Sequence, residues 1–491
     1  MNLNKLLFTA LILLSASAGY SQTDADALRY SQSTITGTAR FTSMAGAFGA
    51  LGGDFSSIIV NPAGLGIYRK SEFTFSTGFY VSHTTSDFIG RSYDENKFNF
   101  NIPNLGFVFT HLTDADRKNR EGWKSVSIGM GINRIQNFHT SSFYESVNRS
   151  NSLLNHFVET ANHGTPFDPF YEQLAWDAGI IYSDTDGTSV ISDVGEPGTY
   201  PITQQRSSIT RGGIYEWNFS VGANYNDKIY LGGGFGISSL RYIEESTYSE
   251  YDRAGVIPVL NSYSMHQDII TRGTGFNFKF GIIARPVEWV RIGASFHTPT
   301  FYPYMQDEYR NIIASNLENI PTSPATSPDG IYNYGMTTPM KAVGSIAFII
   351  AKTGLISADY EFINYSGARF NASSASFAEV NNTIRSKYEP SGNIRIGGEY
   401  RLGDLNFRAG YGFYGSPINS IQRMVGADYS KNYYSGGLGI RHNNYFIEMG
   451  YSYTKSNEYF QQYTLENNVP VEGSRNTVIN HNFVITLGAK F

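Results

Sequence analysis

The chain of 491 residues has no cysteine, no excess of basic residues and, beyond its first residues, no apolar run long enough for a membrane helix. The lack of cysteine excludes disulfides, thiolate zinc sites, cysteine nucleophiles and a lipoprotein anchor. A net charge of −5 with thinly spread Lys and Arg argues against nucleic acid as a partner. A helical membrane protein is excluded because a spanning helix needs about 20 apolar residues. A membrane barrel is not excluded, since its strands are only half apolar.

The first 22 residues have the pattern of a secretory signal peptide. Lys5 precedes an apolar centre from Leu6 to Leu14, and small residues follow before a cleavage point between Ala18 and Gln22. We therefore expect residues 1–22 to be removed and the mature chain to be exported.

Aromatic residues make up 15% of the chain, and 50 residues are glycine, which together favour pleated strands with frequent turns. From Glu72 onward, apolar residues recur at every second position, as in Phe73, Phe75 and Phe79. The pattern predicts an all-β chain with fourteen strands. They start near Glu72, Phe98, Trp123, Gly213, Lys228, Thr271, Val290, Thr337, Gly354, Gly392, Leu405, Tyr433, Tyr445 and Thr477.

The connections between these strands alternate between short and long. Tight turns such as Asn226-Asp227 alternate with long connections, the main ones at about 138–212, 243–270, 300–336 and 365–391. Outer-membrane barrels have this asymmetry, with short periplasmic turns and long extracellular loops. The last strand ends in Phe491, which resembles the assembly signal of such barrels. Residues 71–491 are therefore predicted to form a fourteen-stranded antiparallel transmembrane β-barrel in the outer membrane of a Gram-negative cell.

Residues 23–70 stand before the barrel and are predicted to form a hatch, or plug, inside its lumen. The stretch from Phe41 to Tyr68 is rich in Gly, Ala and Ser, and it turns at Asn61-Pro62-Ala63. Its glycines allow backbone to lie close to a wall, and Pro62 fixes φ at the turn. The alternative is a Gly-rich loop ahead of the first strand.

Charged residues of the strands fall on the face opposite the apolar set, where they avoid a cost of about 2–4 kcal/mol for facing lipid. Four of these cations are candidates for binding a ligand head group: Lys279, Arg291, Arg395 and Arg408. The alternative, which we favour for each, is a salt bridge to Glu399, Glu361 or Glu448 across the wall.

Two strands break their period of two. One slips at Pro103-Asn104, and the other slips between Ile132 and Ile135, after Gly129 and Gly131 leave its inner face bare. A bulge produces such a slip, and proline removes a ladder hydrogen bond. Pro103, Gly129 and Gly131 are therefore candidates for a lateral opening, and the alternative is ordinary bulges that curve the barrel.

Part of the insert at 138–212 has apolar residues at helical spacing, including Leu154, Phe157 and Val158. An amphipathic helix there forms either a hydrophobic landing groove or a surface that packs the loop onto the rim.

The hatch with Asn61-Pro62-Ala63 in GAFGALGGDFSSIIVNPAGLG, the fourteen strands and Phe491 resemble the FadL-type outer-membrane transporters of long-chain fatty acids and other hydrophobic compounds. The segments RIGASFHTPT, ADYEFINYS and NIRIGGEYR look like the branch found in Bacteroidetes-type bacteria. The resemblance implies passive uptake: ligand is caught between the loops, moves to a pocket at the hatch, and leaves sideways near an inward-kinked third strand. It also implies that Asn61, Pro62 and Ala63 lie at the hatch close to that kink.

The expected partners are a hydrophobic, fatty acid-like ligand and outer-membrane lipid, with the chain acting as a monomer. We expect no cofactor and no metal. A haemin receptor is the alternative function, although the 9 histidines form no cluster. Catalysis is not expected, because Ser295 and His297 share a face without a G-x-S-x-G elbow. A structural barrel without cargo would have little reason to keep a plug.

Overall fold

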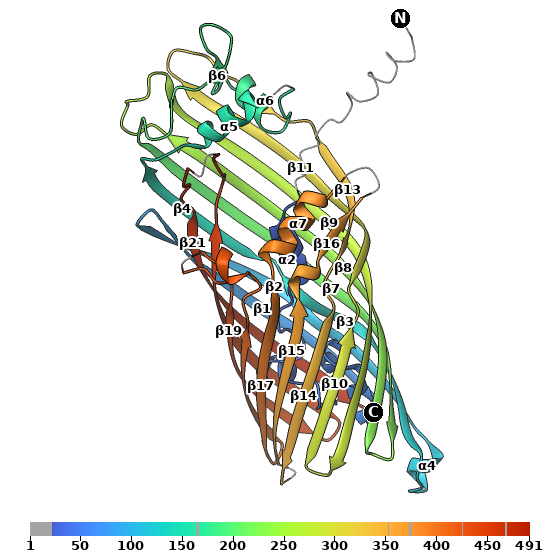
Figure 1. Ribbon diagram of the computed structural model, residues 1–491. Helices are drawn as coiled ribbons and strands as arrows, with labels where there is room; N and C mark the ends of the chain where they lie inside the picture. The colour runs from blue at the N-terminus through green and yellow to red at the C-terminus, as the bar shows by residue number, and fades with distance from the viewer. Residues whose placement is uncertain (1–21, 164–165, 352, 373–375, 425, 467–468) are drawn as a thin grey trace, which may run out of the picture.

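The computed structural model describes residues 22–163, 166–351, 353–372, 376–424, 426–466 and 469–491. The predicted signal peptide, residues 1–22, lies outside these residues except for Gln22. Within the described residues, no helix is long and apolar enough to cross a membrane. Most of the chain forms one antiparallel sheet that closes on itself (Figure 1).

The barrel wall has fourteen strand positions, as predicted. Four positions each hold two strands in line, namely β3 with β4, β10 with β11, β13 with β14 and β15 with β16, and pairing of β1 with β21 closes the barrel. The strands are β1 (Glu72–Phe88), β2 (Arg91–Leu112), β3 (Trp123–Asn137), β4 (Thr140–Asn148), β7 (Ile202–Tyr225), β8 (Ile229–Tyr251), β9 (Leu260–Val287), β10 (Val290–His297), β11 (Phe301–Leu317), β13 (Gly330–Thr337), β14 (Lys341–Ile350), β15 (Gly354–Asn364), β16 (Arg369–Asn371), β17 (Pro390–Leu402), β18 (Leu405–Tyr414), β19 (Lys431–His442), β20 (Tyr445–Phe460) and β21 (Ser474–Lys490), with β12 (Ala325–Thr326) added to β11.

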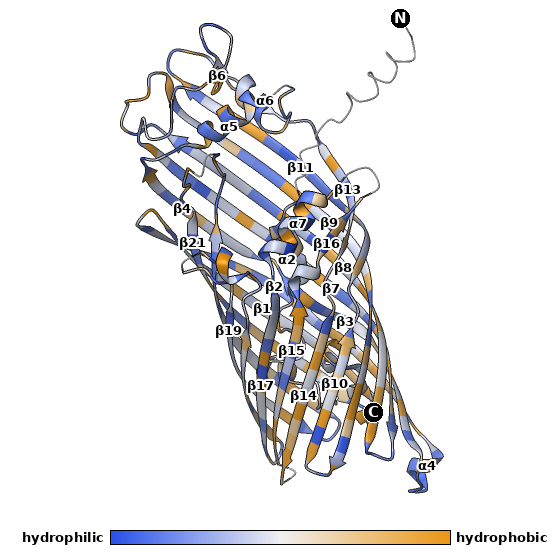
Figure 2. Cartoon of the chain, viewed as in Figure 1, coloured by the Kyte–Doolittle hydropathy of each residue, from blue (hydrophilic) through white to orange (hydrophobic). Residues whose placement is uncertain are grey.

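One part of the wall carries an outward-facing apolar belt, because alternate side chains of a strand point to opposite faces. On β2, Phe98 and Phe100 point outward and are 60% and 54% exposed. On β17, Ile394 and Ile396 are exposed, whereas the intervening Arg395 is buried. Figure 2 shows this belt near the end with the short turns, which we call the turn end; the opposite end is the loop end.

At the loop end, the sheet extends beyond the belt into ranges that were predicted to be loops. β8 runs to Tyr251 and β9 starts at Leu260, so residues 252–259 connect them rather than 243–270. β11 and β13 likewise occupy much of the range 300–336. Outward residues here are polar, such as Gln306 and Glu308, but their backbone groups are still satisfied by the ladder. Polarity alone therefore gave the wrong strand ends.

The other long connections fold into two compact structures. The insert at 138–212 holds β4 and a cap. Leu154 and Phe157 of the cap are buried against β8, β9 and β11. This burial favours the alternative in which the helix packs the loop onto the rim, and not the alternative of a landing groove. The connection at 365–391 folds over the lumen. The cap contains α5 (Leu153–Asn162), α6 (Glu172–Asp177), β5 (Tyr182–Ser183) and β6 (Val190–Ile191). The connection at 365–391 contains η3 (Tyr365–Gly367) and α7 (Ala378–Lys387). A further short helix, α4 (Asp114–Arg117), lies at the turn end.

The hatch lies inside the barrel, as predicted. Its helices are α2 (Asp24–Ser31), α3 (Ala39–Ser43), η1 (Phe55–Ile59) and η2 (Pro62–Ile67). Polar contacts fix it to several strands: Arg40 Nε is 2.8 Å from Glu399 on β17, and the Ala39 amide donates to Thr486 on β21 at 2.7 Å. The hatch is therefore hydrogen-bonded to more than one strand of the wall.

Glycines of the wall make room for the hatch. A Cβ at Gly281 would lie 1.8 Å from Asn61 Oδ1, and a Cβ at Gly437 would lie 2.0 Å from Ser43 Oγ. Such close approach requires glycine, so the hatch and the wall fit as one packed unit. The same holds at Gly106, Gly131, Gly222, Gly232, Gly293, Gly397, Gly410 and Gly450, on strands β2, β3, β7, β8, β10, β17, β18 and β20.

Candidate functional site: a cavity beside an unpaired stretch of wall

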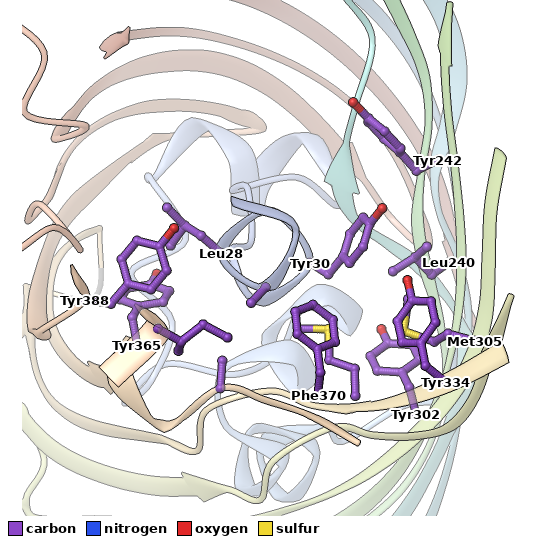
Figure 3. Close-up of a cluster of buried hydrophobic side chains, with 14 of the residues drawn as sticks. Leu28, Tyr30, Leu240, Tyr242, Tyr302, Met305, Tyr334, Tyr365, Phe370 and Tyr388 are labelled. Atoms are coloured by element: carbon purple, nitrogen blue, oxygen red, sulfur yellow. The ribbon is translucent and has the colours of Figure 1, made fainter. Parts of the chain in front are cut away.

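A cavity of about 410 Å³ lies in the lumen above the hatch, toward the loop end. Its lining comes from α2 and the following segment, from β1, β3 and β7, and from β19, β20 and β21. The other side of the lumen is filled by an apolar cluster around α2 (Figure 3). There, Tyr30 packs edge to face against Tyr242 with ring centroids 6.0 Å apart, while Leu28 lies near Tyr388. The cluster confines the cavity to one side of the barrel.

On that side, the wall is not fully hydrogen-bonded. Pairing between β2 and β3 runs from Leu112↔Ser125 to Asn104↔Asn133 and stops there. Above Asn104, β2 still pairs with β1, and above Asn133, β3 and β4 still pair with β7. We call the unpaired stretch between residues 99–103 and residues 134–139 the seam.

Polar side chains bridge the seam in place of backbone hydrogen bonds. Arg134 Nη1 donates to Asn99 Oδ1 at 2.8 Å, and His139 Nε2 lies 3.1 Å from Asn99 Nδ2. At its lower end, Asn104 Nδ2 donates to Asn133 Oδ1 at 2.9 Å. Side chains can move apart without disturbing either strand's other ladder, so the seam can open without loss of backbone pairing.

The seam begins where both predicted slips occur. The β1–β2 register shifts between Ser76 and Gly78, opposite Pro103, and the β3–β7 register shifts between Arg134 and Gln136. Both slips are thus confirmed as bulges. The bulge at Ile135 exposes its carbonyl to the hatch, where it accepts from the Thr34 amide at 2.9 Å.

The Asn61-Pro62-Ala63 segment lies elsewhere. Asn61 Nδ2 donates to Gly49 O at 2.7 Å within the hatch and to Ile282 O at 3.2 Å on β9. The hatch residue that contacts the third-strand bulge is Thr34, whereas Asn61 contacts β9 and β10. Asn61, Pro62 and Ala63 instead seat the hatch against β8, β9 and β10.

Gly129 and Gly131 are paired on both sides, with β2 and with β7. The hatch fills the space beside them, because Leu65 faces Gly129 and Phe55 faces Gly131. Of the three candidates for a lateral opening, only Pro103 lies at the seam.

None of the four predicted head-group cations lies on the lining of this cavity. Three of them are held in ion pairs, the alternative favoured from sequence, although the partner of Lys279 is not one of the three predicted glutamates. Lys279 pairs with Glu216, Arg395 lies 3.5 Å from Glu361, and Arg408 lies 2.6 Å from Glu399 and 2.9 Å from Glu448. Arg291 lies below the hatch, where its Nη1 donates to Leu51 O at 3.0 Å.

The cavity has cations that the sequence analysis did not identify. Arg134 is buried and its hydrogen-bond partners are neutral groups: oxygens of Asn99, Asn137 and Gly212 at 2.8 Å and of Gln136 at 3.2 Å, and His139 Nδ1 at 3.4 Å. Its guanidinium also lies over the Tyr215 ring. Lys431 donates to Gln32 Oε1 at 2.8 Å. Within the described residues, neither has a carboxylate within 4 Å. The other three cations that line the cavity, Arg29, Arg206 and Lys387, pair with Asp26, Glu244 and Asp24, the last two at 2.9 and 2.7 Å.

Comparison with known proteins shows the fold. No family model and no curated protein matches the chain. Among solved structures, a Pseudomonas aeruginosa FadL homologue matches 94% of this chain and 99% of its own, with a TM-score of 0.54 and 12% identity. The P. putida toluene transporter TodX matches 93% and 99% at TM-score 0.54 and 12% identity, and the Ralstonia pickettii toluene transporter TbuX matches 93% and 99% at 0.53 and 15%. The chain therefore has the fold of FadL-type transporters, a fourteen-strand barrel around an N-terminal hatch.

Proposed function

We propose that this chain is a monomeric outer-membrane channel for the passive uptake of hydrophobic compounds, with long-chain fatty acids as the first candidate. The observation that carries the proposal is the luminal cavity that meets the seam at the level of the outward residues Phe98, Phe100 and Ile102. In this proposal the apolar belt sits in the membrane, the turn end faces the periplasm, and the seam opens toward lipid.

Lateral exit suits a hydrophobic cargo. Each CH₂ kept out of water is worth about 0.8 kcal/mol, so passing directly from cavity to lipid avoids the cost of entering the periplasm. The hatch blocks the straight route, because wall glycines and polar contacts hold it on several strands. The hatch thus acts as a fixed floor that directs the cargo toward the seam.

Arg134 and Lys431 are the proposed partners of a fatty-acid carboxylate. Both line the cavity without a carboxylate partner among the described residues, and Arg134 lies at the seam itself. Cation–carboxylate hydrogen bonds are about twice as strong as neutral ones. The head group would be held beside the seam while the tail points toward it.

The proposal is tested by uptake of radiolabelled long-chain fatty acid into cells that lack their own transporter. Cells that express the wild-type chain should take up more fatty acid than cells with the empty vector. Asn61→Ala with Pro62→Ala should reduce uptake at equal surface level, because the hatch loses its contacts with the wall strands. Toluene and haemin are assayed in parallel. Uptake of toluene alone would change the cargo class, uptake of haemin alone would favour the receptor alternative, and no uptake of any of the three by an assembled barrel would refute the channel.

A further inference from the structure

A second cavity, of about 520 Å³, lies on the opposite side of the hatch, at the turn end. Its roof is hatch backbone at Leu51, Gly52 and Gly53, and its walls come from the ends of β10, β14, β15, β17, β18, β19 and β21. We call it the basal cavity. It shares no lining residue with the cavity above the hatch.

The basal cavity is strongly basic. Seven Lys or Arg residues line it, against one carboxylate, Glu399. Four of the cations have acidic partners: Arg40 with Glu399 at 2.8 Å, Arg69 with Asp116 at 2.8 Å, Arg441 with Glu448 at 2.7 Å and Lys490 with Glu72 at 3.4 Å. The remaining three, Lys70, Arg291 and Arg401, have no carboxylate within 4 Å in the part of the chain that the structure describes.

These three cations use only part of their hydrogen-bonding capacity. Lys70 Nζ donates to Asn444 Oδ1 at 3.0 Å, and Arg401 Nε donates to Gly403 O at 2.9 Å. Arg291 donates from Nη1 to Leu51 O, but its Nε is buried and has no hydrogen-bond partner among the described residues. A buried charged donor without an acceptor is costly, which points to an acceptor that enters the cavity.

We propose that the basal cavity binds a phosphate-type anion through Lys70, Arg291 and Arg401. Inorganic phosphate offers four acceptor oxygens and up to two negative charges; a phospholipid phosphodiester also has four oxygens, two of them non-bridging and sharing one charge. Arg presents donors that match the non-bridging oxygens in pairs. A carboxylate has only two acceptor oxygens, which suits three separate cations less well. The anion is either free inorganic phosphate or the headgroup of a phospholipid, since the cavity opens at the turn end beside the belt.

The bound anion would join hatch and wall. Lys70 follows the last helix of the hatch, whereas Arg291 and Arg401 belong to β10 and β17 on the wall. Arg291 also holds the hatch carbonyl of Leu51. Occupancy of the basal cavity therefore adds a tie between the two, independently of any cargo above the hatch.

The test uses the full mature barrel in uncharged detergent. Equilibrium dialysis with radiolabelled inorganic phosphate compares wild type with Arg291→Gln plus Arg401→Gln, and native mass spectrometry counts retained phosphatidylglycerol for the same proteins. The matched control is Arg285→Gln, which changes an arginine at the turn end of β9 that does not line the cavity. Heat-modifiable gel mobility confirms that each variant is folded.

Loss of the charged contacts should raise the Kd for phosphate at least about tenfold in the double variant, while the control keeps the wild-type value. Phosphate binding with this pattern supports a free anion, and phosphatidylglycerol retention with this pattern, in the absence of phosphate binding, supports a headgroup. No binding of either by wild type, or equal loss in Arg285→Gln, overturns the proposal.

Discussion

Cross-linking of the seam distinguishes lateral exit of the cargo through the wall from passage through the hatch. The chain has no cysteine, so Asn99→Cys with His139→Cys places the only two thiols on opposite sides of the seam. A short bismaleimide with a reducible disulfide in its linker then joins β2 to the segment after β3. Cross-linking should abolish uptake of the hydrophobic cargo, and reduction should restore it.

The size of the effect follows from the contacts that bridge the seam. Three polar contacts, Arg134 with Asn99, His139 with Asn99 and Asn104 with Asn133, must separate. At about 0.5–1.5 kcal/mol each, opening costs roughly 1.5–4.5 kcal/mol, so roughly 0.05–7% of molecules are open at any time. Loss of the two Asn99 contacts lowers that cost by about 1–3 kcal/mol. The double variant without cross-linker should therefore take up cargo roughly fivefold or more faster than wild type, provided that opening limits the rate.

The assay measures initial uptake rates in cells with equal surface amounts of barrel. Thr110→Cys with Ser127→Cys is the matched control, because these residues also join β2 to β3, with side-chain oxygens 2.9 Å apart, but lie where the ladder is continuous. Cross-linking this pair should leave uptake unchanged. Undiminished uptake after complete cross-linking of the seam pair would refute lateral exit at this site.

Three further predictions test the seat of the hatch, the head-group site and the loop-end contacts. Gly281→Ala should destabilise the barrel by about 1–3 kcal/mol because the new Cβ collides with the hatch. Gly344→Ala should not, because a Cβ there meets no atom within 4 Å. The two variants are compared by the temperature at which each loses the gel mobility of the folded barrel. Lys431→Gln should raise the concentration for half-maximal fatty-acid uptake about tenfold and leave the uptake of a fatty alcohol unaffected. Lys455 faces outward on the next strand, so Lys455→Gln should change the uptake of neither compound. Asp307 lies beyond the belt, and its burial raises the pKa of its carboxyl from 3.8 to about 6. Between these values the folded state holds a proton that the unfolded state has released. Local stability therefore falls as pH rises from about 4 to 6, by at most about 3 kcal/mol. Asp307 accepts a hydrogen bond from Gln22 Nε2 at 2.7 Å, so hydrogen exchange of residues 22–31 should be better protected at pH 5 than at pH 8. Asp307→Asn should remove the difference, and an unchanged pH dependence in this variant would contradict the assignment.

Local pattern was enough to predict the barrel. A strand shows its period of two without knowledge of its neighbours, and one-residue slips mark bulges, so the strands and both bulges follow from the sequence. Strand ends at the loop end were predicted poorly, because β8 and β9 continue where both faces are polar and only backbone pairing identifies the strand.

The site was harder to predict because it depends on which strands meet and where pairing stops. Arg134 lies in the bulge, where alternation no longer tells which face a residue takes. Lys431 is the first residue of β19 and lines the cavity, whose place in the lumen depends on where α2 packs. One signal was overlooked: many strands carry a glycine on the inner face, and this recurrence could have located the height of the hatch.

The same contacts decide between a moving hatch and an opening wall. Lifting the hatch would break the Arg40–Glu399 ion pair and the Ala39–Thr486 and Gly49–Asp359 hydrogen bonds. It would also break the contacts of Asn61 and separate the hatch from the wall glycines against which it packs. Even at about 0.5–1.5 kcal/mol for each contact, this total exceeds the three contacts of the seam before any loss of packing is counted. A thermally accessible opening is therefore expected at the seam, with the hatch in place. In the proposed function, the hatch then contributes to transport by closing the lumen, so that a cargo in the cavity leaves through the seam.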